Sequence, residues 1–488
     1  MTQYKVPLVI RGRVIEDYDA HFGGRDGATE LVTPSVGKYM SELALTRPSA
    51  MSDLYAISFE EILDYLEELG TRLHLRANSY VQDALDLSLR TSGLSEGILR
   101  DCYANLHKLF AKEQWRQTVD RTIGIDHVEG WVEHAIGNGG RAAIRAFGAR
   151  SVHVIAGNVP QVAAITIARN AVTRGDAIIK TPSNDPLTAS AIARTMIDMA
   201  PDHPLTRHLS VAYWKGGTEA VEERLYRPAN IEKIIAWGGF ASITHISKYL
   251  QPGIDLITLD PKLSSTILGR ETFVDEATMR AAAALAALDV GVYNQEACSN
   301  ARVIYVESGT DQAGLDKANA FGEMLNEEIR ALPPHFSGPA VRMEPALEAE
   351  MSALRLGSAW HKIYGGGREG AVVVSQMDEP VDFAKLLANR VANVVPVDDL
   401  EIPVRAVTAY TQTIGIYPEA LKAQLRDRLS IHGAQRIVSL GGSGSPVFTG
   451  PQDAIEPMRR MCKWIIDESR PESYLKQVLV REDEGELA

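Results

Sequence analysis

From about residue 150 onward, short runs rich in β-branched residues alternate with longer stretches of helical periodicity. The runs are VHVIA, DAIIK, HLSVAYW and EKIIAWG, and helical patterns follow them at 162–174, at 186–200 and through Leu250. Such alternation is typical of βαβ units, in which parallel strands are joined by helices that cover the sheet. The chain is therefore predicted to be an α/β protein.

A second region of alternating strand and helix patterns follows, and no long linker separates it from the first. It contains an Ala-rich helix at 278–288, the strand ARVIYVE, a helix through Leu332, the strand REGAVVVS and later strands toward GAQRIVSLGG. Residues 58–147, by contrast, are predicted to be mostly helical, because their apolar residues recur three and four positions apart. The pattern indicates two parallel-sheet regions preceded by a helical part.

Charge and apolar content exclude several classes of protein. The 488 residues carry a net charge of −13, which disfavours non-specific binding to nucleic acid or to an anionic membrane. No apolar run approaches the ~18 residues of a membrane span, and the apolar run at 6–10 is too short for a signal peptide. We therefore expect a cytoplasmic protein without a membrane span.

The three cysteines, Cys102, Cys298 and Cys462, are too far apart to form a visible disulfide framework or paired zinc ligands. Cys298 lies in the polar loop of DVGVYNQEACSNARVIYVE, between a helix and a strand, which suits a reactive thiol. Taken alone, a structural cysteine is the commoner case. Cys102 is expected on an amphipathic helix, and Cys462 on a packed helix face in MRRMCKWI.

Other candidate residues lie where predicted strands end, the edge at which open α/β sheets bind ligands. Asn158 in AGNVPQV could donate to an oxyanion, and Lys180 at the end of DAIIK could bind phosphate or ribose oxygens. Gly238 and Gly239 in AWGGFAS could let a phosphate approach a helix N-terminus. A turn asparagine, a solvated lysine and a tight turn are the competing interpretations.

The successive motifs AGNVPQV, AIIKTPSNDPLTA, IIAWGGFAS, LITLDPKLSS and YNQEACSNARVIYVE resemble, in order and spacing, those of the aldehyde dehydrogenase superfamily. Within it, these motifs and the later ANRV, QTIGIYP, LRDRLSIHGAQRIVSLG and PQDAIEPMRRMCKWI resemble the acyl-CoA reductase family typified by the reductase of bacterial luminescence.

The resemblance implies an aldehyde dehydrogenase-like fold with two Rossmann-like parallel-sheet domains. We expect residues 1–265 to comprise a helical part (about 1–147) and a dinucleotide-binding domain (about 148–265). A catalytic thiol domain would cover 266–445, and a C-terminal segment 446–488.

The resemblance also implies residue roles. Cys298 would be the nucleophile, and Asn158 with the backbone N–H of Cys298 would form the oxyanion hole. Lys180 would contact the adenosine ribose, and Gly238 and Gly239 would lie beneath the pyrophosphate. Ser183 stands where NAD-preferring relatives commonly carry Glu, which makes NADPH admissible because no charge there repels a 2′-phosphate.

Thr258, counted with the cofactor-side residues, stands in LITLDPK where aldehyde-oxidising relatives carry their general-base Glu. A threonine hydroxyl cannot take a proton from water as a carboxylate does, so hydrolysis of a thioacyl enzyme should be slow. Glu296 lies near the thiol in sequence, where a solvated loop carboxylate is the expected role. Gln295 stands one position earlier than in the common GQxC form, which leaves the loop geometry open.

These features predict NADPH-dependent, reversible reduction of a fatty acyl-CoA thioester to the aldehyde through a Cys298 thioacyl enzyme, with release of coenzyme A. A hydrolytic NAD(P)-dependent aldehyde dehydrogenase, a thiol acyltransferase without nicotinamide, an inactive scaffold subunit and an acyl-phosphate reductase are the alternatives. The resemblance further implies a homo-oligomer and an acyl-transferring partner protein. Acyl chain length and the group that activates Cys298 are left open.

Overall fold

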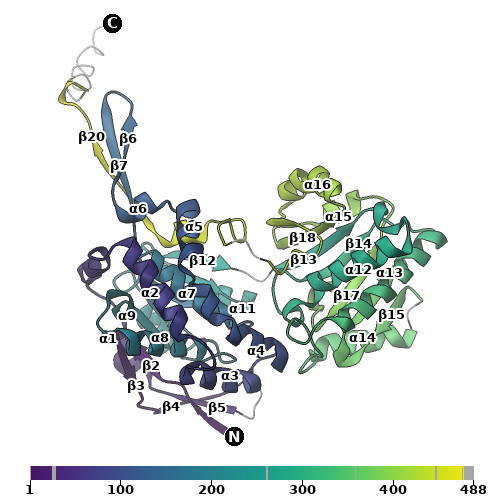
Figure 1. Ribbon diagram of the computed structural model, residues 1–488, viewed down its shortest axis with the longest axis horizontal. Coiled ribbons are helices and arrows are strands. Elements are labelled where there is room, and N and C mark those ends of the chain that lie inside the picture. Colours follow the sequence, from purple (N-terminus) through teal and green to yellow (C-terminus); the bar gives the residue numbers. More distant parts are fainter. Residues whose placement is uncertain are drawn as a thin grey trace.

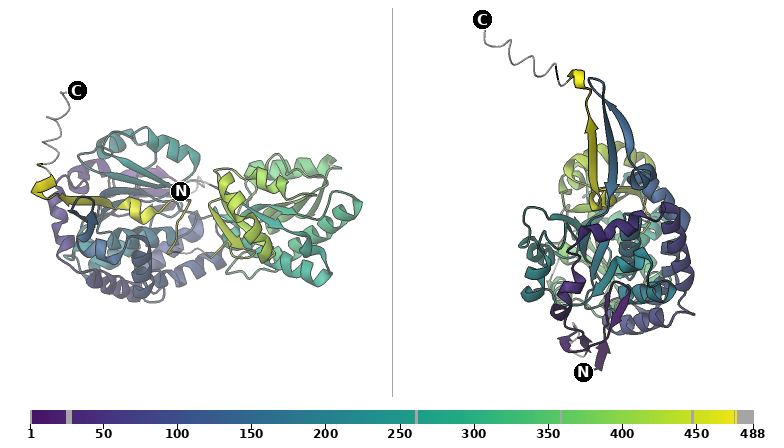
Figure 2. Two further views of the ribbon diagram at one scale, coloured as in Figure 1. Left: turned by 90° about the horizontal axis from the view of Figure 1, so that it is seen from above. Right: turned by 90° about the vertical axis from the view of Figure 1, so that its left-hand side faces the viewer.

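The computed structural model describes residues 2–24, 29–259, 262–357, 359–445, 448–474 and 476. These residues form a larger and a smaller lobe, each built around a mainly parallel sheet (Figure 1). Figure 2 shows the lobes side by side along the long axis, with both the first strands and the last strand in the larger lobe. The chain therefore passes from the first lobe to the second and back again.

The sheet of the larger lobe has the strand order β12-β11-β8-β9-β10-β2-β3. The strands from β12 to β10 are parallel, and the antiparallel hairpin β2–β3 extends the sheet beyond β10. In sheet order their bounds are Asp255–Leu259, Lys233–Trp237, Arg150–Val154, Asp176–Lys180, Leu209–Ala212, Leu8–Ile10 and Arg13–Ile15. The parallel βαβ pattern predicted from the sequence is thus confirmed.

Helices cover both faces of this sheet because its strands are apolar on both sides. In β9, Ala177 and Ile179 pack into the cluster formed with α2, α3, α4, α7 and α8, whereas Ile178 packs with α1, α10 and α11. The helices that the chain forms in this lobe before it enters the smaller lobe are α1 (Met40–Leu43), α2 (Phe59–Arg72), α3 (Ser79–Thr91), α4 (Glu96–Ala104), α5 (Lys112–Thr122), α6 (Ile125–Glu129), α7 (Gln161–Val172), α8 (Thr188–Met199), α9 (Pro204–Arg207), α10 (Glu219–Leu225) and α11 (Phe240–Ser247).

The sheet of the smaller lobe has the order β15-β16-β17-β14-β13-β18-β19, parallel except for the edge strand β15. In that order the bounds are His361–Gly365, Ala371–Ser375, Val391–Pro396, Ala301–Val306, Leu263–Leu268, Thr411–Tyr417 and Arg436–Ser439. Helices α12 and α13 share one apolar cluster with the sheet, α15 and α16 a second, and α14 a third. These helices are Glu276–Gly291, Gln312–Ala331, Pro345–Gly357, Glu401–Ala406 and Glu419–His432 for α12 to α16.

The helical pattern expected over 58–147 ends early. Helix α6 ends at Glu129, and the strands β6 (Val132–Ile136) and β7 (Gly140–Phe147) form a hairpin that pairs with β20 (Lys463–Ser469). The reason is local: Asn138 and Gly139 take positive φ values of 60° and 70°, as tight hairpin turns require. These strands project from the larger lobe as an arm (Figures 1 and 2).

The described residues up to Thr33, which were expected to belong to the helical part, contain strands and no helix. Strands β1 (Thr2–Lys5), β5 (Thr29–Thr33) and β4 (Ala20–Gly23) form a small sheet in that order, beside the β2–β3 hairpin. At the domain boundary, β13 pairs with β14 and β18, so the second sheet begins at Leu263, shortly before the division expected at 265/266.

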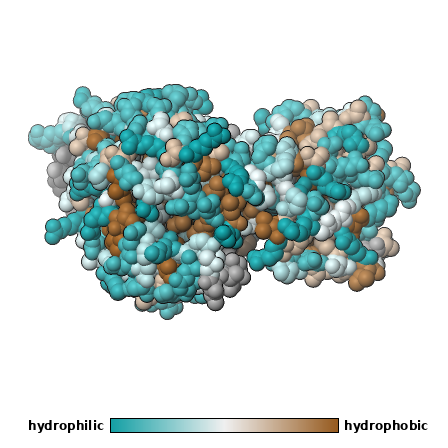
Figure 3. Space-filling model, turned by 60° about the horizontal axis from the view of Figure 1, so that its bottom comes forward, coloured by the Kyte–Doolittle hydropathy of each residue, from teal (hydrophilic) through white to brown (hydrophobic). Residues whose placement is uncertain are grey.

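Cys462 does not lie on a helix. Helix α17 (Pro457–Met461) ends one residue before it and β20 begins one residue after it, although the thiol is buried as expected. Within the described residues, no helix is both long enough and apolar enough to cross a membrane. Figure 3 shows a mostly hydrophilic face with hydrophobic residues gathered near the junction of the lobes and on the larger lobe.

Candidate active site

The site lies where the edges of the two large sheets meet. Asn158, in the loop after β8, donates from its side-chain Nδ2 to the backbone oxygen of Glu296, in the loop before β14, at 3.2 Å. The carboxyl end of a first-lobe strand therefore approaches the amino end of a second-lobe strand. This contact brings together the predicted site residue Asn158 and the loop of Cys298, from positions that lie 138 residues apart in the sequence.

Cys298 is half-buried, and residues at the amino ends of two neighbouring strands contact its thiol and its backbone carbonyl. The Nε2 of Gln412, on β18, donates to Cys298 Sγ at 3.0 Å. The hydroxyl of Ser264, on β13, donates to the Cys298 carbonyl at 2.7 Å and accepts from the backbone N–H of Thr413 at 3.1 Å. The loop position predicted from the sequence is confirmed.

Opposing effects act on the ionisation of this thiol. Burial raises the pKa of Cys298 above its ordinary value, and the negative charge of Asp453 raises it further. The hydrogen bond from Gln412 and the positive charge of Arg302 lower the same pKa. Burial raises the pKa of Cys102 and of Cys462 to about 12. Both of those thiols are buried, so Cys298 is the thiol best placed to react.

The chain reaches Cys298 through an unusual backbone segment. Tyr293, Asn294 and Gln295 have φ values of 51°, 53° and 67°, a left-handed run that residues other than glycine rarely adopt. The Gln295 amide holds this run against β17, donating to Val391 O at 3.0 Å and accepting from Val391 N at 3.0 Å. Gln295 is buried, and its side chain fixes the loop before Cys298 to β17. This is the loop geometry that the shifted position of Gln295 left open.

Asn158 is positioned by a contact between two first-lobe loops. The side chain of Asn184 donates to the carbonyl of Gly157 at 2.7 Å, and a Cβ on Gly157 would stand only 2.3 Å from Asn184 Oδ1. A side chain at position 157 would therefore force Asn184 or Pro182 to shift. The Asn158 amide nitrogen faces the thiol loop, and its Oδ1 is buried without a hydrogen-bond partner among the described residues.

Glu296 is exposed, as expected for a solvated loop carboxylate. Its Oε1 lies 3.5 Å from the place a Cβ would occupy on Gly93, in the turn between α3 and α4. The carboxylate therefore faces the first lobe's helical layer.

The cofactor-side residues occupy the strand ends predicted for them. Lys180 ends β9, with its Nζ 5.8 Å from the centroid of the Trp214 ring, and Ser183 is half-buried just beyond. Gly238 and Gly239 connect β11 to α11, and at Gly239 an added Cβ would meet nothing within 4 Å. The open space above this helix N-terminus could hold a phosphate group.

Thr258 lies on the edge strand β12, paired with Ala236 of β11, and is half-buried. Asp260 and Pro261, the second and third positions after Thr258 in this motif, lie outside the described residues.

Sequence reasoning missed four polar residues around the thiol. Gln412 contacts the sulfur, Asp453 accepts from Gln412 Nε2 at 2.7 Å, and the charges of Arg302 and Arg436 act on the thiol. Gln412, Asp453 and Arg436 all fall in motifs that carried the family resemblance. Arg302 follows Cys298 by four positions in the same motif. The nearness of the other three to Cys298 depends on tertiary contacts across more than 100 positions, which no local pattern indicates.

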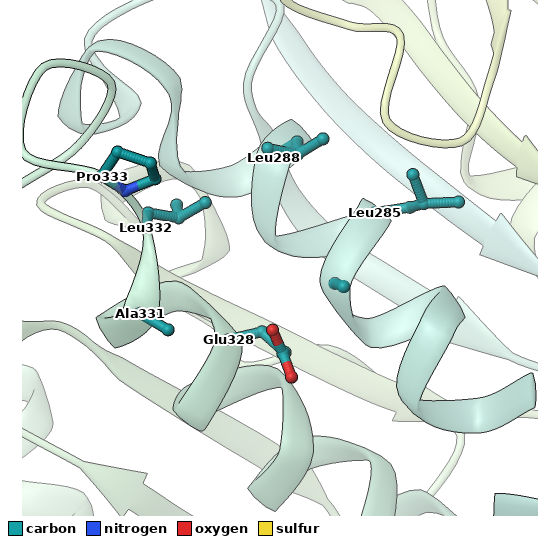
Figure 4. Close-up of a pocket in the computed structure, with 7 residues that line it drawn as sticks. Leu285, Leu288, Glu328, Ala331, Leu332 and Pro333 are labelled. Carbon is teal, nitrogen blue, oxygen red and sulfur yellow. The ribbon is translucent and has the colours of Figure 1, made fainter. Parts of the chain in front are cut away.

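Two cavities lie apart from these residues. One of about 240 Å³ lies between α12 and α13 and is lined mainly by apolar side chains such as Leu285, Leu288 and Leu332 (Figure 4). Another of about 450 Å³ lies at the amino ends of β11 and β12, beside α17. None of the predicted site residues lines either cavity.

Solved structures of aldehyde dehydrogenases share this fold. The chain superimposes with a TM-score of 0.73 on the NADP-dependent glyceraldehyde-3-phosphate dehydrogenase of Bacillus halodurans, at 12% identity over 96% of this chain and 100% of that one. Aldehyde dehydrogenase 21 of Physcomitrella patens also gives 0.73, at 13% identity over 96% and 99%. The expected aldehyde dehydrogenase-like fold is confirmed.

The family is decided by a sequence model described as acyl-CoA reductase (LuxC), which matches residues 54–464. The chain belongs to this acyl-CoA reductase family. Among relatives, a long-chain acyl-protein thioester reductase of Vibrio harveyi is 26% identical over 96% of this chain and 94% of its own length. A protein of the same name from Photorhabdus luminescens is 29% identical over 86% and 84%. As a member of the acyl-CoA reductase family, the chain is an enzyme of the oxidoreductase class.

Proposed function

We propose that this acyl-CoA reductase family member reduces a long-chain acyl thioester to the aldehyde, using NADPH and a covalent acyl group on Cys298. One observation carries the proposal: the half-buried Cys298 thiol stands in a loop that the Asn158 amide reaches from the opposite sheet. Acyl transfer needs a nucleophile to attack the carbonyl carbon and, beside it, a hydrogen-bond donor to stabilise the oxyanion.

In this mechanism the Cys298 thiolate attacks the thioester carbonyl and expels the thiol that carried the acyl group. The Asn158 Nδ2 and the backbone N–H of Cys298 donate to the oxyanion. In the free enzyme that Asn158 nitrogen donates to the Glu296 carbonyl, a bond that the substrate oxygen would replace. The Gln412 N–H stabilises the sulfur whenever it carries negative charge.

The residues at the carboxyl edge of the first sheet fit a dinucleotide. Gly239 leaves open space at the first turn of α11 for a phosphate, and Lys180 supplies a cation two strands along the sheet. Ser183 brings no negative charge against a 2′-phosphate, which favours NADPH. When bound, NADPH supplies the hydride that reduces the thioester carbon.

Three other residues, Thr258, Glu296 and Asp453, disfavour hydrolysis of the acyl enzyme. Thr258 is a hydroxyl where a base would be needed, and Glu296 faces the turn that contains Gly93. Asp453, the carboxylate that acts on the thiol, accepts the Gln412 N–H. A thioacyl group on Cys298 would therefore persist long enough to be reduced, which favours aldehyde over acid as the product.

The donor is proposed to be an acyl group carried as a thioester on a protein. The relatives from Vibrio harveyi and Photorhabdus luminescens are named for acyl-protein thioesters, whereas the family description refers to acyl-CoA. Both donors place the same thioester carbonyl on Cys298.

The first test measures NADPH oxidation and aldehyde formation with acyl-protein, acyl-CoA and acyl-phosphate donors in parallel. Cys298→Ala should lower the rate at least about 10³-fold, because the covalent step is lost. Cys462→Ala, which removes a buried thiol outside the site, should keep the rate. Undiminished aldehyde formation by Cys298→Ala would refute the proposal.

The hydrolytic alternative is tested by incubating the enzyme with aldehyde and NADP⁺ without any acceptor thiol. We expect little carboxylic acid, and acyl thioester once a thiol acceptor is added. Steady production of acid would instead indicate an aldehyde-oxidising enzyme, and absence of saturable NADPH binding would indicate a thiol acyltransferase.

A further inference from the structure

We infer that Asp453 is a positioning residue for the reactive thiol, because it fixes which end of the Gln412 amide faces Cys298. The inference rests on the proposed function in one respect, that Cys298 is the nucleophile. The sequence analysis identified neither Gln412 nor Asp453 as a candidate functional residue.

The hydrogen-bond geometry carries the argument. Gln412 Nε2 lies 3.0 Å from Cys298 Sγ and 2.7 Å from Asp453 Oδ1, so the two hydrogens of one amide nitrogen serve both acceptors. An ionised carboxylate only accepts hydrogen bonds. If the amide were rotated by half a turn, its oxygen would face the Asp453 oxygens and the bond would become a repulsion. Asp453 therefore selects the orientation in which Gln412 presents a donor to the sulfur.

The orientation matters because a donor favours the thiolate and an acceptor favours the thiol. Asp453 thus affects Cys298 in two opposite ways. Its charge disfavours the thiolate directly, while its hold on Gln412 stabilises the thiolate through the amide. Arg302 and Arg436 are the cations whose charges also act on this sulfur, and Glu296 acts on Arg302.

The strained backbone at Asp453 is consistent with a positioning role for this residue. Asp453 and Ala454 have φ values of 54° and 59°, two consecutive left-handed residues without glycine, a strain typical of functional sites. The Gln452–Ile455 bridge closes this turn, with N···O distances of 2.9 and 3.0 Å.

The turn is anchored on the first lobe, whereas the groups that it serves belong to the second. Arg169, buried on α7, donates from Nη2 to Gln452 Oε1 at 3.0 Å, and the charge of Asp453 acts on the Arg169 guanidinium. Gln412 and Cys298 lie on the second lobe's β18 and the loop before β14. The orientation of the Gln412 amide thus depends on contacts from both lobes.

The experiment is a double-mutant cycle on the full-length enzyme. Asp453→Ala removes both the negative charge and the acceptor of Gln412 Nε2, whereas the same substitution in a Gln412→Met background removes the charge with no amide left to orient. The measurement is the pH dependence of Cys298 alkylation by iodoacetamide, followed by mass spectrometry of the Cys298 peptide. It reports the thiolate fraction and needs neither cofactor nor acyl substrate.

At pH values below the pKa of the thiol, Asp453→Ala should accelerate alkylation about threefold less with Gln412 present than in the Gln412→Met background, because only with Gln412 does loss of the carboxylate also release the amide. The Gln412→Met substitution removes the amide and keeps the length of the side chain. Asp453→Glu, which retains both charge and acceptor, should restore most of the wild-type profile.

Equal acceleration by Asp453→Ala in the two backgrounds would overturn the inference. If the double variant does not fold, Asp453→Ala decides alone: alkylation several-fold faster than in the wild type, as loss of the charge by itself would give, would also overturn it. A failure of the proposed function would look different: NADPH oxidation with acyl thioesters would be absent while the alkylation difference remained.

Discussion

At the scale of single residues, the three cysteines differ in what surrounds them. Cys102 and Cys462 are buried thiols, with pKa values raised by burial to about 12. Cys298 is half-buried, accepts a hydrogen bond from the Gln412 amide, and has its pKa lowered by the positive charge of Arg302. These surroundings, which a single sequence does not display, separate a reactive cysteine from structural ones.

Asn158 should contribute mainly to the transition state. Removing one oxyanion donor typically costs about 10² to 10³ in kcat, so Asn158→Ala should lose about that much in thioester reduction with a smaller change in KM. Steady-state kinetics measure this effect, and thermal melting controls for the fold. A variant that changed KM alone would indicate that Asn158 only binds substrate.

Asp185 gives a pH-dependent prediction for stability. Burial raises the pKa of this carboxyl to about 6, from an ordinary value of 3.8, while Thr188 donates to it. The folded state therefore holds the proton more tightly than the unfolded state, so this group's contribution to stability falls as pH rises from about 4 through 6 and stays low above 6.

Asp185→Asn, which keeps an acceptor without the charge, should stabilise the protein at pH 7.5 by roughly 1–3 kcal/mol, the upper end corresponding to about two pKa units. The gain should shrink toward pH 4, where the native carboxyl is protonated. Chemical denaturation at the two pH values measures it. A gain independent of pH would mean that ionisation of Asp185 is not the cause.

At the scale of elements, the site consists of strand ends. Runs such as VHVIA and DAIIK predict where β8 and β9 stop, so Asn158 and Lys180 could be placed at a sheet edge from the sequence alone. The sequence also showed the polar loop before β14. It did not show that β18 is the neighbour of β13, and that pairing brings Gln412 to the sulfur. Strand order depends on long-range packing rather than on local pattern.

The glycines between β11 and α11 allow a test at this scale. Gly239 has φ −69° and open space around an added Cβ, so Gly239→Ala should fold normally. The new methyl group would occupy the space assigned to a phosphate, and the Kd for NADPH should rise about tenfold or more. Gly37→Ala, at another open position, is the matched control and should leave binding unchanged. Unaltered NADPH affinity in Gly239→Ala would remove α11 from the proposed cofactor site.

At the scale of the whole molecule, the return of the chain to the first lobe has a consequence for biosynthesis. The larger lobe contains the first strands of the chain and also α17 and β20, near its end, and the turn with Asp453 precedes them. A ribosome that has released residues 1–440 has produced the thiol, the Asn158 loop and both large sheets. It has not yet produced the carboxylate that orients the amide beside that thiol, nor the outer strand of the arm. The surroundings of the proposed nucleophile are therefore completed only after both large sheets have been synthesised.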